Sequence, residues 1–321
     1  MRKIFTLFVA ALCCASMFAT EGALSGKFTV NEDGKQVQFS QGNLQYQAST
    51  GTWKFATNQW DTIGSTNANI SLSYNGWIDL FGWGTGDDPI YLGSNETFTE
   101  WGTNAIVNGG NEGGLWVTLS RDEWEYLFRG RTDAEKLFGM GSVNGVNGTI
   151  LLPDDWSVGK FSDTENGLQY YESIECFYNN NGNNFSFHTY DGDDWKTMED
   201  RGAVFLPAAG ARWDDKAMEF IGTAGYYWSS SLGVCTYDGD EIIVRRGSNI
   251  GFSKWDLYSK TSTVCRYGLS VRLVQDVTAE EQGIVNIATP ADKARKVMMD
   301  GTMYIATPDG KIYNAQGAEV K

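Results

Sequence analysis

Few residue types in this chain could carry out chemistry. His188 is the single histidine, so a metal site built from several histidines is excluded. A Ser-His-Asp relay would have to use His188, and no GxSxG nucleophile motif is present. The glycine-rich segments lack both the P-loop lysine pattern and a GxGxxG between a strand and a helix. The sequence therefore predicts a protein that is not an enzyme.

Four aspartate doublets are the most suggestive polar feature: Asp87-Asp88, Asp154-Asp155, Asp193-Asp194 and Asp214-Asp215. Clustered carboxylates can ligate calcium, which takes six to eight oxygen ligands. The spacing of an EF-hand loop is missing, and aspartates also cap helices and turns. We therefore predict capping roles and no cofactor, with calcium as the alternative.

Aromatic and charged residues gather between positions 232 and 267. Tyrosine, tryptophan and arginine are the residue types that anchor binding interfaces. Here they lie in or beside loops expected between the late strands, where they either contact a ligand or cover the core. The candidate ligand-binding residues are Tyr237, Asp238, Asp240, Arg245, Arg246, Trp255, Tyr258 and Arg266.

The acidic composition excludes some partners. The chain has 40 Asp and Glu against 25 Lys and Arg, a net charge of −15. Nucleic-acid binding needs basic surface that displaces counterions from phosphates, so no nucleic-acid partner is predicted. Adsorption to anionic lipid is disfavoured for the same reason. A protein or a glycan remains as the expected ligand.

The N-terminus has the pattern of a secretory signal peptide. Arg2 and Lys3 precede an apolar run at positions 4–12, and small residues follow. The run is too short to span a bilayer, and no other stretch approaches the ~20 apolar residues that a transmembrane helix needs. We expect residues 1–19 to be removed and the protein to be secreted or held at the cell surface, associated with the outer membrane. Lipidation of Cys14 is the alternative.

Three cysteines follow this segment: Cys176, Cys235 and Cys265. Export would permit a disulfide. The predicted pair is Cys235 with Cys265, which leaves Cys176 unpaired, although a sequence alone does not fix connectivity.

The remaining pattern indicates a β-rich, loop-rich domain. Residues 44–55 contain two alternating runs joined by a turn, which predicts a hairpin. The glycine-rich run 76–86 predicts an irregular, packed wall around large aromatic side chains. The polar stretch that runs from Pro153 to about residue 192 is expected to be mostly loop. Further strands are expected at 149–152, 203–210, 225–231, 241–246 and 268–274.

Two short helices are expected. Ser120 and Glu123 form a capping box, and Gly130 is a stop signal. Between them three large apolar residues follow the spacing i, i+3, i+4 of one helix face: Trp124, Leu127 and Phe128. The second helix should start near Asp193-Asp194 and end before Gly202.

Several motifs together resemble a known superfamily. LWVTLSRDEWEYLFRGR (115–131), GYYWSSS (225–231) and GLSVRLV (268–274) resemble segments of formylglycine-generating-enzyme-like (sulfatase-modifying factor) proteins. GTILLPDDW (148–156) and GAVFLPAAG (202–210) are similar to a group of paralogous domains from Fibrobacter and Bacteroidetes. Both groups share the C-type-lectin-like fold. The resemblance covers roughly residues 22–275 and implies an α+β, C-type-lectin-like domain over 20–276.

The resemblance implies a fold more clearly than an activity. Formylglycine-generating enzymes bind copper through a closely spaced cysteine pair, which Cys235 and Cys265 do not match. The calcium-binding triplets of sugar-binding C-type lectins are also missing. In C-type-lectin-like domains the late loops often face a ligand, so the expected function is an exported binding module for a protein or glycan. An oxidoreductase related to formylglycine-generating enzyme and a structural component of the cell surface are the alternatives.

The C-terminal region differs in composition. Residues 277–295 predict a linker, and residues 296–321 predict a short β tail whose hairpin turns lie at Asp300-Gly301 and Asp309-Gly310. The tail resembles C-terminal segments of secreted Bacteroidetes proteins, some of which are sorting signals for type IX secretion. The alternative is a small β appendage.

Overall fold

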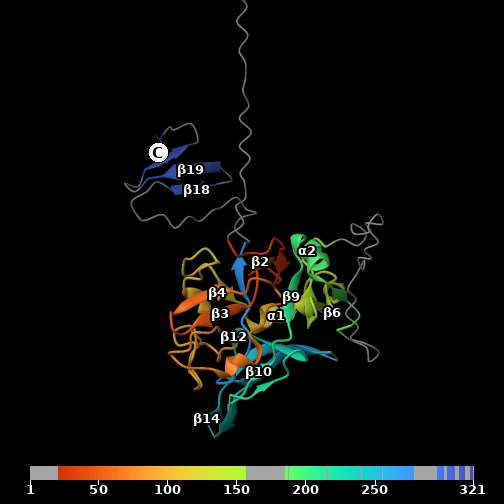
Figure 1. Ribbon diagram of the computed structural model, residues 1–321. Coiled ribbons are helices and arrows are strands. Elements are labelled where there is room, and N and C mark those ends of the chain that lie inside the picture. The colour runs from red at the N-terminus through yellow and green to blue at the C-terminus, as the bar shows by residue number, and fades with distance from the viewer. Residues whose placement is uncertain are drawn as a thin grey trace, which may run out of the picture. The chain divides into compact units, whose positions relative to one another are not determined.

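The computed structural model describes residues 21–156, 185–186, 188–214, 216–239, 241–254, 256–277, 295–299, 302–307, 311–314 and 319–320. The chain divides into two compact units, residues 1–278 and 279–321. Unit 1 is β-rich with two α-helices (Figure 1), which is the expected β-rich α+β class. The predicted signal peptide, Cys176 and most of the predicted linker lie outside the described residues. None of the helices in the described part has the length and apolar character needed to cross a bilayer.

Three sheets form the framework of unit 1. The first is antiparallel and has the order β1 (Phe28–Thr29), β2 (Gln36–Phe39), β17 (Leu273–Asp276) and β5 (Val117–Thr118). The second has the order β8 (Thr189–Tyr190), β6 (Phe138–Val143), β7 (Val146–Leu151) and β9 (Val204–Pro207). The third is antiparallel and has the order β12 (Ala224–Leu232), β15 (Arg246–Ser253) and β16 (Leu257–Val264).

The described residues of unit 1 also form three separate hairpins and three short 3-10 helices. The hairpins are β3 (Leu44–Gln47) with β4 (Thr52–Phe55), β10 (Ala211–Arg212) with β11 (Met218–Glu219), and β13 (Thr236–Asp238) with β14 (Glu241–Val244). The 3-10 helices are η1 (Gly64–Ala68), η2 (Trp101–Thr103) and η3 (Ala134–Lys136). The β3–β4 hairpin confirms the prediction for residues 44–55.

Both predicted helices are confirmed. Helix α1 spans Arg121–Arg129, and Ser120 and Glu123 make both hydrogen bonds of the capping box. The three residues of its apolar face are buried in a core that also includes Phe39 and Val274. Helix α2 spans Gly192–Asp200 and is capped by Asp191, whose side chain accepts bonds from two backbone amides of the first turn. Figure 1 shows α2 beside β6 and β9.

The glycine-rich run 76–86 forms the expected irregular wall. Phe81 and Trp83 are buried in a second core with several other aromatic side chains. The indole of Trp83 donates to the carbonyl of Ser229 over 3.0 Å, and the indole of Trp228 donates to the carbonyl of Phe81 over 2.6 Å. These bonds attach the wall to β12, so a segment without regular strands still has a fixed path.

A buried guanidinium joins distant parts of unit 1. Arg272 is 1 % exposed. Its Nη2 donates to Gln59 Oε1 over 2.9 Å, and its Nη1 donates to the carbonyl of Phe205 and to Asn43 Oδ1. Gln59 Oε1 also accepts from the backbone amide of Phe205 over 2.6 Å. A buried charge must be surrounded by such acceptors, so these residues hold β9 against the chain around β3 and β4.

A second buried arginine anchors the end of α1. Arg131 donates from Nε to the carbonyl of Leu127, from Nη1 to that of Leu152 and from Nη2 to that of Leu137. Nη1 also meets Asp154 Oδ1 at 3.1 Å. This arginine satisfies carbonyls that the end of the helix and the neighbouring turns would otherwise leave unpaired.

Unit 2 is a four-stranded antiparallel sheet with strands in sequence order. Its strands are β18 (Arg295–Met299), β19 (Thr302–Ala306), β20 (Ile312–Asn314) and β21 (Glu319–Val320). The pairing of β18 with β19 and of β19 with β20 confirms the two hairpins that the Asp-Gly dipeptides predict.

One strand prediction is wrong, and one hairpin was not predicted. The strand expected at 268–274 begins only at Leu273, and positions 268–270 form isolated bridges to three different partners. The long hairpin of β15 and β16 is missing from the prediction, because its inward positions include small polar residues. Ser248, Asn249 and Ser259 are buried there and hide the expected apolar alternation.

We predict that Ser120→Ala lowers the free energy of unfolding by about 1 kcal/mol, because Ser120 Oγ accepts from the Glu123 amide at the start of α1. Ser120→Thr keeps an acceptor and should stay close to the original chain. Urea denaturation curves of the two variants give the measurement. Equal losses in both variants would show that the cap is not the cause.

Candidate functional site

The predicted ligand-binding residues that the structure describes lie around the β13–β14 hairpin, except Tyr258. Tyr237 and Asp238 lie on β13, and the Tyr237 side chain is 56 % exposed. Arg245 and Arg246 lie at the base of the β13–β14 hairpin. Nη1 of Arg245 donates to the carbonyl of Glu96 over 3.1 Å, so this arginine holds a neighbouring loop.

The backbone of Arg266 lies near the base of the β13–β14 hairpin, because the amide of the preceding residue, Cys265, donates to the carbonyl of Arg245 over 3.1 Å. Tyr258 pairs with Gly251 on β15, five residues along the strand from Arg246, which corresponds to about 17 Å. Arg266 forms a two-pronged ion pair with Asp214 in the β10–β11 loop. Asp240 and Trp255 lie outside the described residues. The structure therefore does not bring all of the predicted residues together into one site.

Three aspartates of the doublets have structural roles: Asp154, Asp193 and Asp194. Asp154 Oδ2 accepts from the amide and hydroxyl of Thr29, while its Oδ1 faces Arg131. Asp193 and Asp194 lie in the first turn of α2, where negative charge is favourable. Within the described ranges no three His, Cys, Asp or Glu side chains are grouped so that they could hold a metal ion.

The disulfide predicted between the two late cysteines is absent. Cys235 and Cys265 are both buried and both free thiols, whereas the sequence predicts a disulfide between them. Burial raises the pKa of the Cys265 thiol to about 12, and the neighbouring Cys235 adds to the effect. A thiol with such a pKa stays protonated at neutral pH and is a poor nucleophile and a poor metal ligand.

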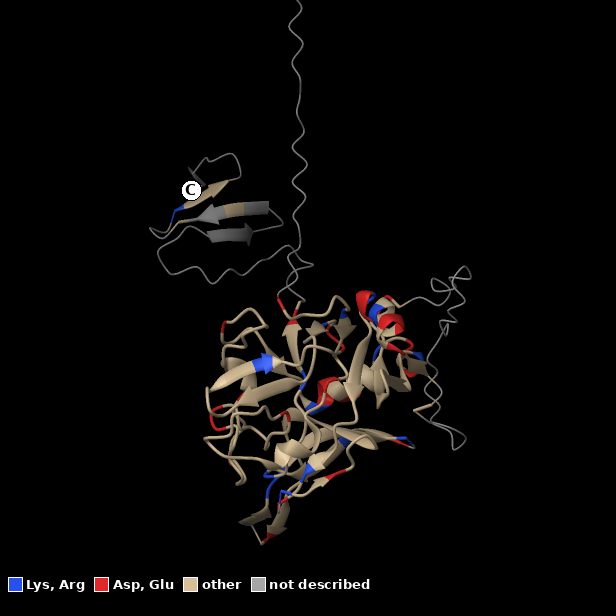
Figure 2. Ribbon diagram, viewed as in Figure 1, with Lys and Arg blue, Asp and Glu red and all other residues tan. Residues whose placement is uncertain are grey.

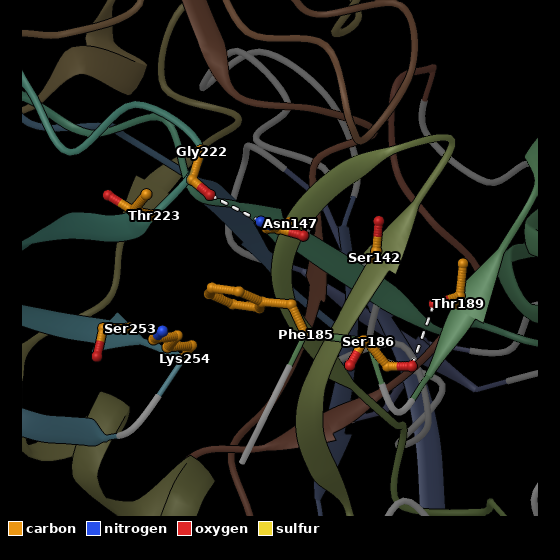
Figure 3. Close-up of a pocket in the computed structure, with 9 residues that line it drawn as sticks. All are labelled: Ser142, Asn147, Phe185, Ser186, Thr189, Gly222, Thr223, Ser253 and Lys254. Carbon is orange, nitrogen blue, oxygen red and sulfur yellow. Dashed lines mark hydrogen bonds between the residues drawn. The ribbon is translucent and has the colours of Figure 1, made fainter. Parts of the chain in front are cut away.

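A pocket of about 520 Å³ lies between the second and third sheets (Figure 3). Its volume is within the usual range for small-molecule sites. The lining side chains are mostly hydroxyls and amides, with one ammonium group and one aromatic ring. The residues that line it are Ser142, Asn147, Phe185, Ser186, Thr189, Gly222, Thr223, Ser253 and Lys254.

The strand register creates a polar row along one wall of this pocket. Ser142 on β6 pairs with Asn147 on β7 and, on its other side, with Thr189 on β8. Directly paired residues place their side chains on the same face of a sheet. A hydroxyl, an amide and a second hydroxyl therefore lie in a row across three neighbouring strands.

The opposite wall comes from a tight turn and the end of β15. The amide of Gly222 donates to the carbonyl of Ala208 over 2.7 Å, and Asn147 Nδ2 donates to the carbonyl of Gly222 over 2.8 Å. Both bonds hold the turn against the polar row. Figure 3 shows the Phe185 ring projecting toward the side formed by Thr223, Ser253 and Lys254.

The lining of this pocket consists mainly of neutral hydrogen-bonding groups. None of the described residues that line the pocket carries a carboxylate, an imidazole or a thiol. The backbone carbonyl of His188 accepts from the Ser142 amide over 2.7 Å. Acidic residues are concentrated instead along α2 (Figure 2). The pocket offers hydrogen-bond donors and acceptors around an apolar surface.

Sequence reasoning missed this pocket, because its residues are ordinary ones for loops and strand ends. Ser142 and Asn147 are close in the sequence, but the turn residues Gly222 and Thr223 and the strand end at Ser253 are distant. The sequence signal that could have found the polar row is the hairpin at 138–151. Its register follows from the Asn144-Gly145 turn dipeptide.

A buried carboxyl group outside the pocket, that of Asp79, has a pKa that lies closer to neutral pH than usual. Asp79 is fully buried and accepts from the Ile63 amide over 3.0 Å and from Asn67 Nδ2 over 2.7 Å. Burial raises its pKa from 3.8 to about 6, against the opposing effect of these bonds and of Arg212. The Arg212 guanidinium donates to the carbonyl of Leu80 over 2.7 Å.

We predict that Asp79 makes the folded state less stable as pH rises from about 4 to about 7. The folded-state pKa lies above the unfolded value, so the contribution is fully present below 3.8 and is lost as pH rises through about 6. Over this interval the loss amounts to about 3 kcal/mol. Thermal melts of Asp79→Asn should lack this part of the pH dependence.

The exposed Asp238→Asn is the matched control and should keep the original pH profile. Identical slopes for the original chain and Asp79→Asn would contradict the role of Asp79.

We predict that iodoacetamide modifies Cys265 slowly in the folded chain and rapidly after unfolding in guanidinium chloride, since the raised pKa and burial both protect it. Peptide mass spectrometry on the Cys176→Ser variant gives the rates. Rapid modification of the folded chain would contradict the buried thiol. No modification after unfolding without reductant would show the disulfide.

Comparisons with known proteins do not assign the chain to a family. No protein-family model matches it, and no curated protein and no solved structure matches it significantly.

Proposed function

We propose that this chain is an exported binding module whose pocket holds a glycan residue or a similar polyhydroxylated group. The observation that carries the proposal is the polar row of Thr189, Ser142 and Asn147, which faces a ring and further hydroxyls across the pocket. A sugar hydroxyl both donates and accepts hydrogen bonds, as do serine and threonine hydroxyls and the asparagine amide.

The charge of the chain favours a neutral glycan. A net charge of −15 repels polyanions and acidic glycans over long range. Lys254 is the single cationic side chain among the described residues of the lining. Neutral sugars carry no such electrostatic penalty.

Export and fold family form part of the proposal. The N-terminal segment keeps the pattern of a signal peptide. The β-rich architecture with two short helices is compatible with the C-type-lectin-like fold that the resemblance to formylglycine-generating-enzyme-like proteins implies. A protein that acts outside the cytoplasm meets glycans on cell surfaces and in the medium.

The buried thiols favour binding over oxidation chemistry. An oxidoreductase of the formylglycine-generating type needs two accessible thiols that can lose their protons. The raised pKa of Cys265 and the burial of both cysteines work against this role.

A glycan microarray probed with the full chain tests the proposal. We expect binding to neutral glycans, and we expect the double variant Ser142→Ala/Thr223→Val to weaken it about tenfold or more, since two hydrogen-bonding hydroxyls are lost. The control is Thr236→Val, an exposed threonine on β13 that does not line the pocket.

Binding that is unchanged in the double variant would place the glycan site elsewhere. No glycan binding by a folded chain would reject the proposal as a whole.

A further inference from the structure

We propose that the glycan extends beyond the pocket onto an aromatic ledge, which we define as Trp213, Phe220, Tyr226 and Tyr267, so that the preferred ligand is a chain of neutral sugars and not a single sugar. This inference rests on the proposed function. It goes further because it assigns a second subsite and a minimum ligand length.

The ledge is a continuous set of edge-to-face rings. The centroids of Trp213 and Tyr267 lie 4.6 Å apart, and those of Trp213 and Phe220 lie 6.2 Å apart. Phe220 meets Tyr226 at 6.3 Å. Phe220 is 45 % exposed, and the other three rings are half-buried. Such rings offer flat apolar surfaces to solvent, on which the C–H faces of sugars can pack.

An exposed ion pair borders the rings. Arg266 Nη2 donates to Asp214 Oδ2 over 2.7 Å, and the Arg266 guanidinium lies 5.8 Å from the centre of the Tyr267 ring. Both charged side chains are about two-fifths exposed, at 40 % and 45 %. The pair presents donors and acceptors side by side, which suits the neighbouring hydroxyls of a sugar.

The backbone of Phe220 is the strongest sign that this ring is needed at the surface. Its φ is +61°, a left-handed conformation that glycine or asparagine adopts readily and a bulky residue rarely does. The Phe220 carbonyl accepts from the amides of Thr223 and Ala224, which fixes this conformation. Strain of this kind is typical of functional positions.

The ledge is continuous with the pocket through this same turn. Gly222 and Thr223 line the pocket, and Phe220 precedes Gly222 by two residues, at most about 7 Å of chain. The bonds from Gly222 to Ala208 and Asn147 hold the turn in place. A ligand that leaves the pocket over this turn therefore reaches the Phe220 ring within the length of about one sugar.

The variant Phe220→Gly separates binding from folding. Glycine adopts a φ of +61° without strain, which offsets part of the loss of the ring contacts with Trp213 and Tyr226, so the variant should remain folded. It removes the exposed ring but leaves the pocket residues unchanged. Tyr91→Ala is the control, because it removes another exposed aromatic side chain, one that belongs neither to the pocket nor to the ledge.

Affinity electrophoresis of the full chain in gels containing dextran, mannan, xylan or laminarin measures polymer binding. Saturation-transfer NMR with glucose, mannose and xylose measures binding of single sugars. We expect at least one polymer to retard the original chain and Phe220→Gly to weaken that interaction about fivefold, since one stacked ring is lost. Single-sugar binding by Phe220→Gly and polymer binding by the Tyr91→Ala control should be unchanged.

The outcomes separate the two proposals. Retardation of Phe220→Gly equal to that of the original chain, with loss in Ser142→Ala/Thr223→Val, would overturn the ledge and leave the pocket. Loss in Phe220→Gly with full retardation of the pocket variant would overturn the pocket as the glycan site and, with it, the continuous path. No retardation by any polymer and no binding of any single sugar would overturn both.

Discussion

The burial of the Arg272 guanidinium is the constraint on which the rest of unit 1 depends. Burial lowers its pKa to about 10, so it remains a cation at neutral pH. A buried cation without acceptors costs several kcal/mol, so the segments that supply its acceptors have to meet. Those acceptors belong to β9, to the loop after β4 and to the residue before β3. The apolar cores then form around elements whose positions this arginine has set.

The strands that Arg272 holds in place also position the residues of the candidate site. Strand β9 pairs with β7, and β7 carries Asn147 beside the Ser142 of β6. The same asparagine holds the turn whose Phe220 reaches the ledge. A chain of backbone and side-chain bonds thus connects the central arginine with the surface where we place the ligand. The same arrangement of strands therefore positions both the pocket and the ledge.

Local signals in the sequence predict local structure well. Ser120, Glu123 and Gly130 define α1, and the Asp-Gly dipeptides define the hairpins of unit 2. The β15–β16 hairpin escapes prediction because Ser248 and Asn249 are buried by tertiary pairing that no local pattern encodes. The pocket could not be predicted from the sequence for the same reason, since strand pairing brings its walls together. Residue type alone suggested Tyr237 and Tyr258, which the fold places far apart.

The central arginine also bears on how the chain folds in time. Arg272 lies 213 and 229 positions from Gln59 and Asn43, whose side chains accept from its guanidinium. Closing such long loops is slow, and contacts of this kind are characteristic of slowly folding topologies. Until the last strand of unit 1 arrives, its earlier segments lack the cation that joins them. Unit 1 is therefore expected to complete its folding only after the segment that carries Arg272 has been synthesised.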